Sequence, residues 1–142
     1  MKNILFYSEN VNYILPHKNK IRNLLKILAT EEGKNIGQLS YIFCSDDFLL
    51  EINKQYLHAD YLTDVITFDY CEKNVVAGDI FISVERVKEN SMLYQQYFFD
   101  EMLRVVVHGL LHLCGYKDKQ EQEQQQMREK ENYYIEKYKT LL

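Results

Sequence analysis

Several residue types are scarce in this sequence, and each scarcity argues against a class of protein. The 142 residues include one proline and five glycines, which excludes collagen-like and Pro/Gly-rich low-complexity chains. The three cysteines, Cys44, Cys71 and Cys114, form no CxxC pair. An odd number of cysteines at wide spacing argues against a disulfide framework and against a thiolate-only zinc site. We therefore expect reduced thiols and a cytoplasmic location.

Long hydrophobic runs are also lacking. The most apolar stretch, residues 102–115, is interrupted by one arginine and two histidines, and it falls below the ~20 residues that cross a bilayer. The apolar run at residues 4–7 gives way to polar residues 8–10, well short of the hydrophobic region of a signal peptide. We expect a soluble protein that is not exported and has no membrane partner.

Positive charge is not in excess. Seventeen basic and twenty-one acidic side chains give a formal charge of −4, which argues against a protein that coats nucleic acid by bulk charge. Basic residues do gather near the start of the first predicted helix, where they could follow a phosphate backbone or form an ordinary solvated face: His17, Lys18, Lys20, Arg22 and Lys26.

The pattern of apolar residues predicts an α+β fold. A chain of 142 residues fits one domain, residues 1–142, that buries about two-thirds of its unfolded surface. Helical spacing and runs of β-formers give the elements. Strands are predicted over residues 3–8, 39–44, 64–70 and 78–84, and helices between Pro16 and Gly33 and over residues 47–56, 84–97, 99–114 and 120–139. We expect a small mixed β-sheet of about four strands covered by helices.

Three local features refine this picture. Residues 64–70 and 78–84 are separated by a short polar loop, so we expect neighbouring strands. Residues 99–114 are hydrophobic almost all round, which predicts a buried helix in the C-terminal half. Residues 120–139 are rich in Gln, Glu and Lys with a thin apolar stripe that includes Met127, Tyr134 and Tyr138. That stripe favours a solvated helix over low complexity.

A possible metal site lies on the buried helix. His108 and His112 are four residues apart, so they share one helix face with Cβ atoms ~5–6 Å apart, close enough for both imidazoles to reach one zinc ion. Gly115 ends the helix, and Asp118 follows three residues later. Two histidines and one carboxylate leave the fourth tetrahedral position for water, as in catalytic zinc sites. Asp118 could instead be only a turn residue.

The residue after the first histidine separates this segment from zinc peptidases. The spacing H-x-x-x-H-x-x-G-x-x-D is close to the long zinc-hydrolase pattern, but Gly109 replaces the glutamate that takes a proton from water in those enzymes. Gly109 has no side chain that could accept a proton. A standard peptidase is therefore disfavoured, whereas Lewis-acid chemistry on a phosphoryl oxygen stays possible.

Three segments together resemble the YbeY-type endoribonucleases, also called rRNA maturation factors. Residues 108–118 read HGLLHLCGYKD and resemble the family signature H-G-x-L-H-L-x-G-Y-D-H. Residues 52–68 read INKQYLHADYLTDVITF and resemble L-N-x-x-Y-R-x-x-D-x-P-T-D-V-L-S-F. Residues 78–83 read GDIFIS and resemble G-D-I-x-I-S. The three segments stand in the family order.

The resemblance implies a zinc-dependent, single-strand-specific endoribonuclease in the cytoplasm. Its substrate would be an rRNA precursor, chiefly the 3′ end of the small-subunit rRNA, with the small ribosomal subunit as partner and a further role in ribosome quality control. One zinc per chain would be held by His108, His112 and Asp118. Two alternatives stay open: a ribosome-assembly binding factor with a mainly structural metal, and a zinc hydrolase of a small molecule.

Three departures from the family pattern bear on the expected site. Asp118 stands where the family has its third histidine, Leu57 where it has an arginine, and Leu62 where it has a proline. An oxygen ligand is acceptable to zinc, so the loss of the arginine bears on catalysis more than on metal binding. Arg104 is a candidate replacement, because it lies one helical turn before His108.

Several residues have two interpretations. Arg104 could act on the scissile phosphate, or could pair with Asp100 four residues away. Asp64 and Asp79 could make turn or cap hydrogen bonds, or could orient a metal-bound histidine. Cys114 is expected to be a core residue and not a ligand. Three tyrosines could stack on unpaired bases or be ordinary aromatics: Tyr13, Tyr56 and Tyr61.

Overall fold

Four strands form one mixed sheet in the computed structural model, which describes residues 3–142. The strands are β1 (Ile4–Glu9), β2 (Asn35–Cys44), β3 (Val65–Asp69) and β4 (Val75–Ser83). Their order is β1-β2-β4-β3. The first three in this order are parallel, and β3 pairs with β4 antiparallel. The predicted four-stranded sheet and the predicted neighbours at residues 64–70 and 78–84 are confirmed.

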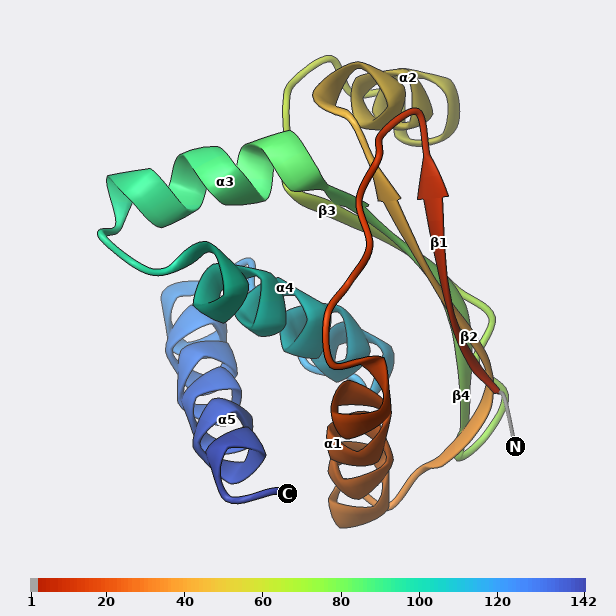
Figure 1. Ribbon diagram of the computed structural model, residues 1–142. Coiled ribbons are helices and arrows are strands. Elements are labelled where there is room, and N and C mark those ends of the chain that lie inside the picture. Colours follow the sequence, from red (N-terminus) through yellow and green to blue (C-terminus); the bar gives the residue numbers. More distant parts are fainter. Residues whose placement is uncertain (1–2) are drawn as a thin grey trace.

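Five helices surround this sheet (Figure 1). They are α1 (Lys18–Glu31), α2 (Asp46–Leu57), α3 (Val84–Leu93), α4 (Phe98–Leu113) and α5 (Glu121–Lys139). In Figure 1, α1, α4 and α5 lie on one side of the sheet, with α4 in the middle, while α2 lies at the end where β2 finishes. Within residues 3–142, no helix is both long and apolar enough to cross a membrane. The predicted α+β class is confirmed.

Side chains alternate between the two faces of the sheet. Leu39, Tyr41 and Phe43 of β2 face the main core, together with Ile80 and Ile82 of β4. The intervening residues face a smaller cluster under α2: Cys44, Ile66, Phe68 and Phe81, with Leu49 of the helix. The sheet therefore packs against α4 on one face, and α2 covers part of the other face near the end of β2.

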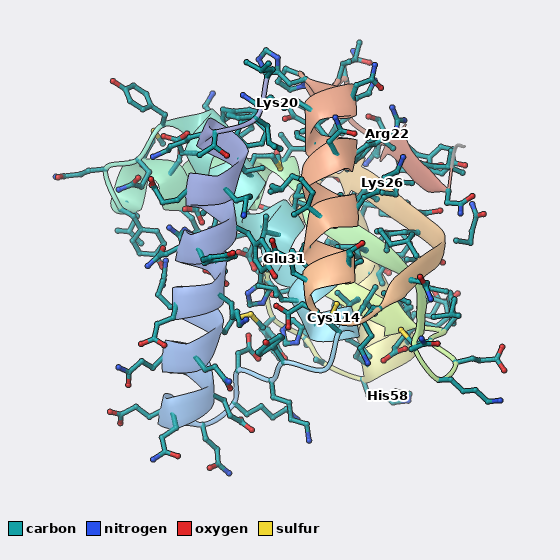
Figure 2. The ribbon with its side chains drawn as sticks, turned by 90° about the horizontal axis from the view of Figure 1, so that it is seen from below. Lys20, Arg22, Lys26, Glu31, His58 and Cys114 are labelled. Atoms are coloured by element: carbon teal, nitrogen blue, oxygen red, sulfur yellow. The ribbon has the colours of Figure 1, made fainter. Side chains whose placement is uncertain are left out.

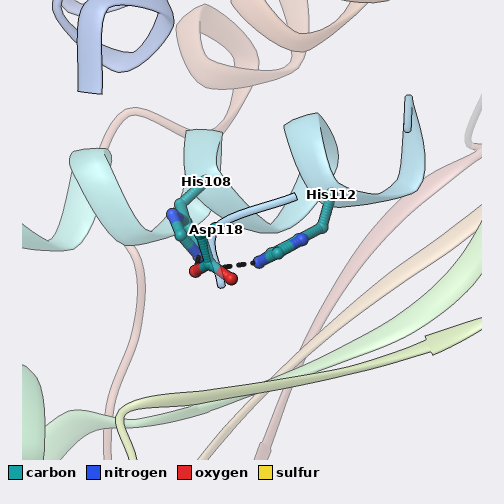
Figure 3. A group of neighbouring side chains, drawn as sticks. All are labelled: His108, His112 and Asp118. Atoms are coloured by element: carbon teal, nitrogen blue, oxygen red, sulfur yellow. Dashed lines mark ion pairs between the residues drawn. The ribbon is translucent and has the colours of Figure 1, made fainter. Parts of the chain in front are cut away.

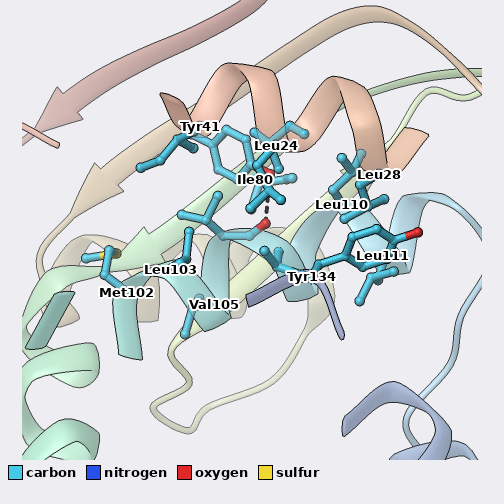
Figure 4. Close-up of a cluster of buried hydrophobic side chains, with 14 of the residues drawn as sticks. Leu24, Leu28, Tyr41, Ile80, Met102, Leu103, Val105, Leu110, Leu111 and Tyr134 are labelled. Atoms are coloured by element: carbon cyan, nitrogen blue, oxygen red, sulfur yellow. Dashed lines mark hydrogen bonds between the residues drawn. The ribbon is translucent and has the colours of Figure 1, made fainter. Parts of the chain in front are cut away.

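Helix α4 forms the centre of the main core (Figure 4). Ten of its residues are buried, as its nearly uniform apolar sequence predicts. The buried Tyr41 hydroxyl donates a hydrogen bond to the Val106 carbonyl at 2.8 Å. This contact fixes α4 on the sheet, so side chains on its remaining face are held in place relative to the strands.

Local chemistry explains several of the helix ends. Ser45 caps α2 by accepting the Phe48 N–H at 3.1 Å, as expected of an N-cap serine. Gly115 has a φ of +110° just after α4, which suits a glycine at that end. The helix predicted over residues 84–97 ends at Leu93. Residues 92–97 are all exposed, so no burial of apolar side chains continues that helix.

Candidate metal centre

Helix α4 carries His108 and His112 on the face that also carries Arg104. The two rings lie 4.5 Å apart between centroids with an interplanar angle of 83°. Their side chains are 18% and 25% exposed, so both are partly shielded from water yet open on one side. Figure 3 shows both rings pointing away from the helix axis toward Asp118.

Asp118 completes the group because the chain turns back at Gly115. Its Oδ2 atom lies 3.3 Å from Nε2 of His108 and 3.3 Å from Nε2 of His112. The three ligand atoms all lie within 4.8 Å of one another. Ligands about 2.0 Å from a tetrahedral ion are separated by about 3.3 Å. The two separations that involve Asp118 therefore match tetrahedral coordination, and the three predicted ligands come together in a group that could hold a metal ion.

The other nitrogen of each ring has its own partner. Nδ1 of His112 lies 2.9 Å from the Tyr116 carbonyl oxygen, and Nδ1 of His108 lies 2.6 Å from Oε2 of Glu131. A carbonyl can only accept a hydrogen bond, so His112 carries a proton on Nδ1, and Nε2 is the ring nitrogen that is left to bind a metal ion beside the Asp118 carboxylate.

Glu131 is a buried carboxylate that α5 places beneath the histidines. It is 5% exposed. Burial alone would raise its pKa, but hydrogen bonds from His108 and Arg104 outweigh burial and lower it. Burial likewise works against the charged form of His108, yet the hydrogen bond and charge of Glu131 outweigh burial and raise the pKa of His108. This carboxylate–histidine pair resembles those that orient metal-bound histidines.

Arg104 is bound to α5 and not to its own helix. Its guanidinium donates to Oε1 of Glu131 at 2.9 Å and to Oδ1 of Asn132 at 2.9 Å. Among the ion pairs of residues 3–142, its partner is Glu131, so the alternative pairing with Asp100 is wrong. The packing of α5 on α4 supplies a nearer carboxylate. Arg104 thus holds one oxygen of the carboxylate whose other oxygen holds His108.

The candidate ligands line a cleft of about 390 Å³ between α3, β3, α4 and α5. Two more carboxyl groups, Asp64 and Glu101, line it, and burial raises the pKa of both. Tyr94 at the end of α3 and Arg128 of α5 also reach the cleft. The centre is therefore accessible to a substrate from solvent.

Gly109 is explained by packing. A Cβ atom at this position would lie 2.8 Å from Cγ2 of Ile80 on β4 and 3.1 Å from its Cδ1. Both distances are too short for ordinary contact, so only glycine lets α4 approach β4 this closely. The residue that separates this segment from the zinc peptidases thus faces the sheet, away from the cleft.

The other predicted candidates are distributed differently. Asp64 lines the cleft, but the carboxylate that is hydrogen-bonded to His108 belongs to Glu131. Asp79 accepts the Tyr70 hydroxyl at 3.3 Å and contacts no histidine among the described residues. Cys114 is half-buried against the main core, and burial raises its pKa to about 12. It is absent from the metal-ligand group within residues 3–142.

The predicted RNA-contacting residues lie outside the cleft. Tyr13 packs against Phe43 and Phe98 and is an ordinary core aromatic, whereas Tyr56 and Tyr61 are exposed without lining the cleft. Three of the basic residues lie along α1 in Figure 2: Lys20, Arg22 and Lys26. Arg22 donates a hydrogen bond to the Ile4 carbonyl, and the Lys20 ammonium lies over the Tyr138 ring. A role for these cations in RNA binding stays a prediction.

Several cleft residues were missed at the sequence level, among them Tyr94, Glu101, Arg128 and Glu131. For Glu131 a signal existed. It lies four residues after Met127 and three before Tyr134, on the apolar stripe that predicted the helix. A carboxylate in the middle of a buried stripe indicates a buried polar partner.

Comparison with known proteins assigns the family. Residues 7–139 match the family model described as Endoribonuclease YbeY. The chain is 48% identical over 130 residues to Endoribonuclease YbeY of Cytophaga hutchinsonii, with 91% of each chain covered. It is 46% identical over 132 residues to that of Christiangramia forsetii, covering 93% of this chain and 92% of the other. A solution structure of a Thermotoga maritima protein matches with a TM-score of 0.67 and 30% identity, over 95% of this chain and 88% of that one. The chain belongs to the YbeY endoribonuclease family.

Proposed function

We propose that this protein is a metal-dependent endoribonuclease that cleaves single-stranded rRNA precursor. Its family is named for endoribonuclease activity, so the chain is an RNA-cleaving hydrolase. One observation supports metal dependence above the others: two imidazole nitrogens and one carboxylate oxygen converge within 4.8 Å of one another beside an open cleft. The small-subunit rRNA 3′ end as substrate, the small subunit as partner, a role in ribosome quality control and a cytoplasmic location are the finer parts of the proposal.

The donor set fits zinc. His108, His112 and Asp118 would hold one zinc ion per chain and leave one position open. When bound there, zinc supplies Lewis-acid chemistry and makes water more acidic. The same donors also accept nickel, cobalt and iron, so the experiment below compares metals.

The protein's own side chains prepare the site for that ion. Glu131 and the Tyr116 carbonyl hold the two Nδ1 atoms, which turns both Nε2 atoms toward Asp118. Partners of this kind typically change metal affinity or activity 10–100-fold when they are removed. Arg104 braces Glu131 and lines the cleft. Its direct action on the scissile phosphate stays a prediction.

The proposal is tested with protein purified without a histidine tag. A labelled single strand carrying the small-subunit rRNA 3′ end is compared with the same strand in a duplex. Cleavage of the single strand is expected, with loss on chelation and recovery when zinc is added. His112→Ala is expected to be inactive under the same conditions.

Three results would overturn the proposal. Cleavage that persists in His112→Ala would show that the activity does not need this centre. Binding to the small subunit, unaffected by His112→Ala and without cleavage, would favour an assembly factor with a structural metal. Turnover of a small phosphodiester by a protein with no affinity for RNA would favour the small-molecule hydrolase.

A further inference from the structure

Two arginines line the metal cleft, and they differ in what holds them. Arg104 on α4 is 23% exposed, and its guanidinium is bound to Glu131 and Asn132. Arg128 on α5 is 60% exposed, and its nearest carboxylate oxygen, on Glu131, lies 4.0 Å away. Among residues 3–142 the Arg128 side chain makes no hydrogen bond. The cleft thus contains one occupied guanidinium and one with available donors.

Arg128 is not needed to stabilise Glu131. That carboxylate already accepts hydrogen bonds from His108 at 2.6 Å and from Arg104 at 2.9 Å. An exposed ion pair at the 4.0 Å limit adds little to stability. Arg128 lies three residues before Glu131 on the same helix, but its guanidinium is available to bind a ligand.

The lining of the cleft is rich in carboxyl groups, which bears on the role of Arg128. Four carboxyl groups line the cleft: Asp64, Glu101, Asp118 and Glu131. The arginines that line it are Arg104 and Arg128. Such a lining repels a polyanion unless cations offset it. Glu131 already neutralises Arg104, so the charge that can meet an incoming phosphate among these residues is that of Arg128.

We propose that Arg128 contacts a phosphate of single-stranded RNA beside the candidate metal centre, whereas Arg104 is a positioning residue for Glu131 and His108. This inference rests on the proposed function. A guanidinium presents paired N–H donors that match phosphate oxygens, and it keeps its charge at any physiological pH. RNA in the cleft would therefore be held by Arg128 and placed with a phosphate next to the open position of the centre.

The test compares Arg128→Ala and Arg128→Lys with the matched control Lys139→Ala. Lys139 lies on the same helix, is 61% exposed and pairs with Glu136 three residues away, but it does not line the metal cleft. Binding of a single-stranded oligoribonucleotide to zinc-loaded protein is measured over a range of salt concentrations. Each phosphate contact to a single strand contributes about 0.7 to the slope of log affinity against log salt.

Arg128→Ala is expected to weaken RNA binding and to lower kcat/KM by about tenfold, and to make the salt slope shallower by about 0.7. Arg128→Lys keeps the charge and is expected to keep the slope, with an intermediate kcat/KM because the paired donors are lost. Zinc content and melting temperature are expected to match those of the wild type in both variants. Lys139→Ala is expected to leave kcat/KM and the slope unchanged.

The outcomes separate this inference from the function on which it rests. If the wild type cleaves RNA and Arg128→Ala behaves like Lys139→Ala in slope and kcat/KM, only the role of Arg128 is overturned. The same holds if Arg128→Ala loses zinc or melting temperature in proportion to activity, since its role is then structural. If the zinc-loaded wild type neither binds nor cleaves RNA, the proposed function fails, and the inference fails with it.

Discussion

Glu131 on α5 lies 2.6 Å from Nδ1 of His108 on α4, and this contact joins two successive helices through residues that are 23 positions apart. One oxygen of Glu131 orients the histidine and the other accepts from Arg104. The histidine in turn directs Nε2 toward Asp118 at 3.3 Å. The geometry of the candidate metal centre therefore depends on how α5 packs against α4.

Replacing Glu131 tests that dependence. Glu131→Gln keeps the shape of the side chain but removes the charge that favours His108 as a donor. We expect zinc affinity to fall about 10–100-fold with the fold retained. Zinc titration with a competing chelator measures the change. Glu129→Gln, an exposed position on the same helix, is the matched control. Equal zinc affinity in the two variants would show that Glu131 does not support the centre.

The close approach of α4 to β4 makes a second prediction. Gly109→Ala places a methyl group 2.8 Å from Ile80, so we expect it to lower the free energy of unfolding by about 1–3 kcal/mol. Ile80→Ala removes the atoms that clash. The double variant should therefore lose less unfolding free energy than the two single variants lose in sum, as measured by urea unfolding. Simple additivity of the two effects would contradict this packing account.

Glu32 predicts a pH dependence of stability. Its carboxylate accepts hydrogen bonds from Tyr116 and Tyr134 at 2.7 Å and from Lys130 at 3.0 Å. Burial alone would raise the pKa of Glu32, but these donors outweigh burial and lower it below 4.5. The unfolded chain then binds the proton more readily than the folded one. The stabilisation is complete above the unfolded pKa and is lost as pH falls through the folded pKa.

The corresponding variant is Glu32→Gln. At neutral pH we expect it to be less stable than the wild type by about 1–3 kcal/mol, and we expect the difference to shrink as pH falls below about 4.5. Unfolding curves at several pH values measure this. Glu31→Gln serves as control, since Glu31 makes a more exposed pair with Lys137 and is expected to cost little. A stability difference that does not change with pH would count against this role of Glu32.

Local signals in the sequence predicted much of this architecture. Periodicity gave the helices and strands, Ser45 gave a helix start, and Gly115 gave the turn that returns Asp118 to the histidines. These features depend on residues that are close together in the chain, so a pattern in the sequence carries them. The grouping of His108 and His112 follows in the same way from helical geometry.

Long-range packing supplied what the sequence could not. Arg104 pairs with Glu131 and not with Asp100, because α5 lies against the face of α4 that carries Arg104. The position of β4 between β2 and β3 also decides which side chains form the cleft. The stripe on α5 predicted a helix but not its partner. The role of Glu131 therefore became visible only with the two helices placed together.

Bound metal per chain is the most direct test of the metal centre. Protein purified without a histidine tag is compared with His112→Ala, Asp118→Ala and, as control, His58→Asn at the exposed end of α2. We expect about one zinc per chain in the wild type and the control, and loss of zinc in the other two variants. Zinc lost only in His112→Ala would make Asp118 a turn residue. A wild-type protein that takes up no metal, even after reconstitution, would contradict the account.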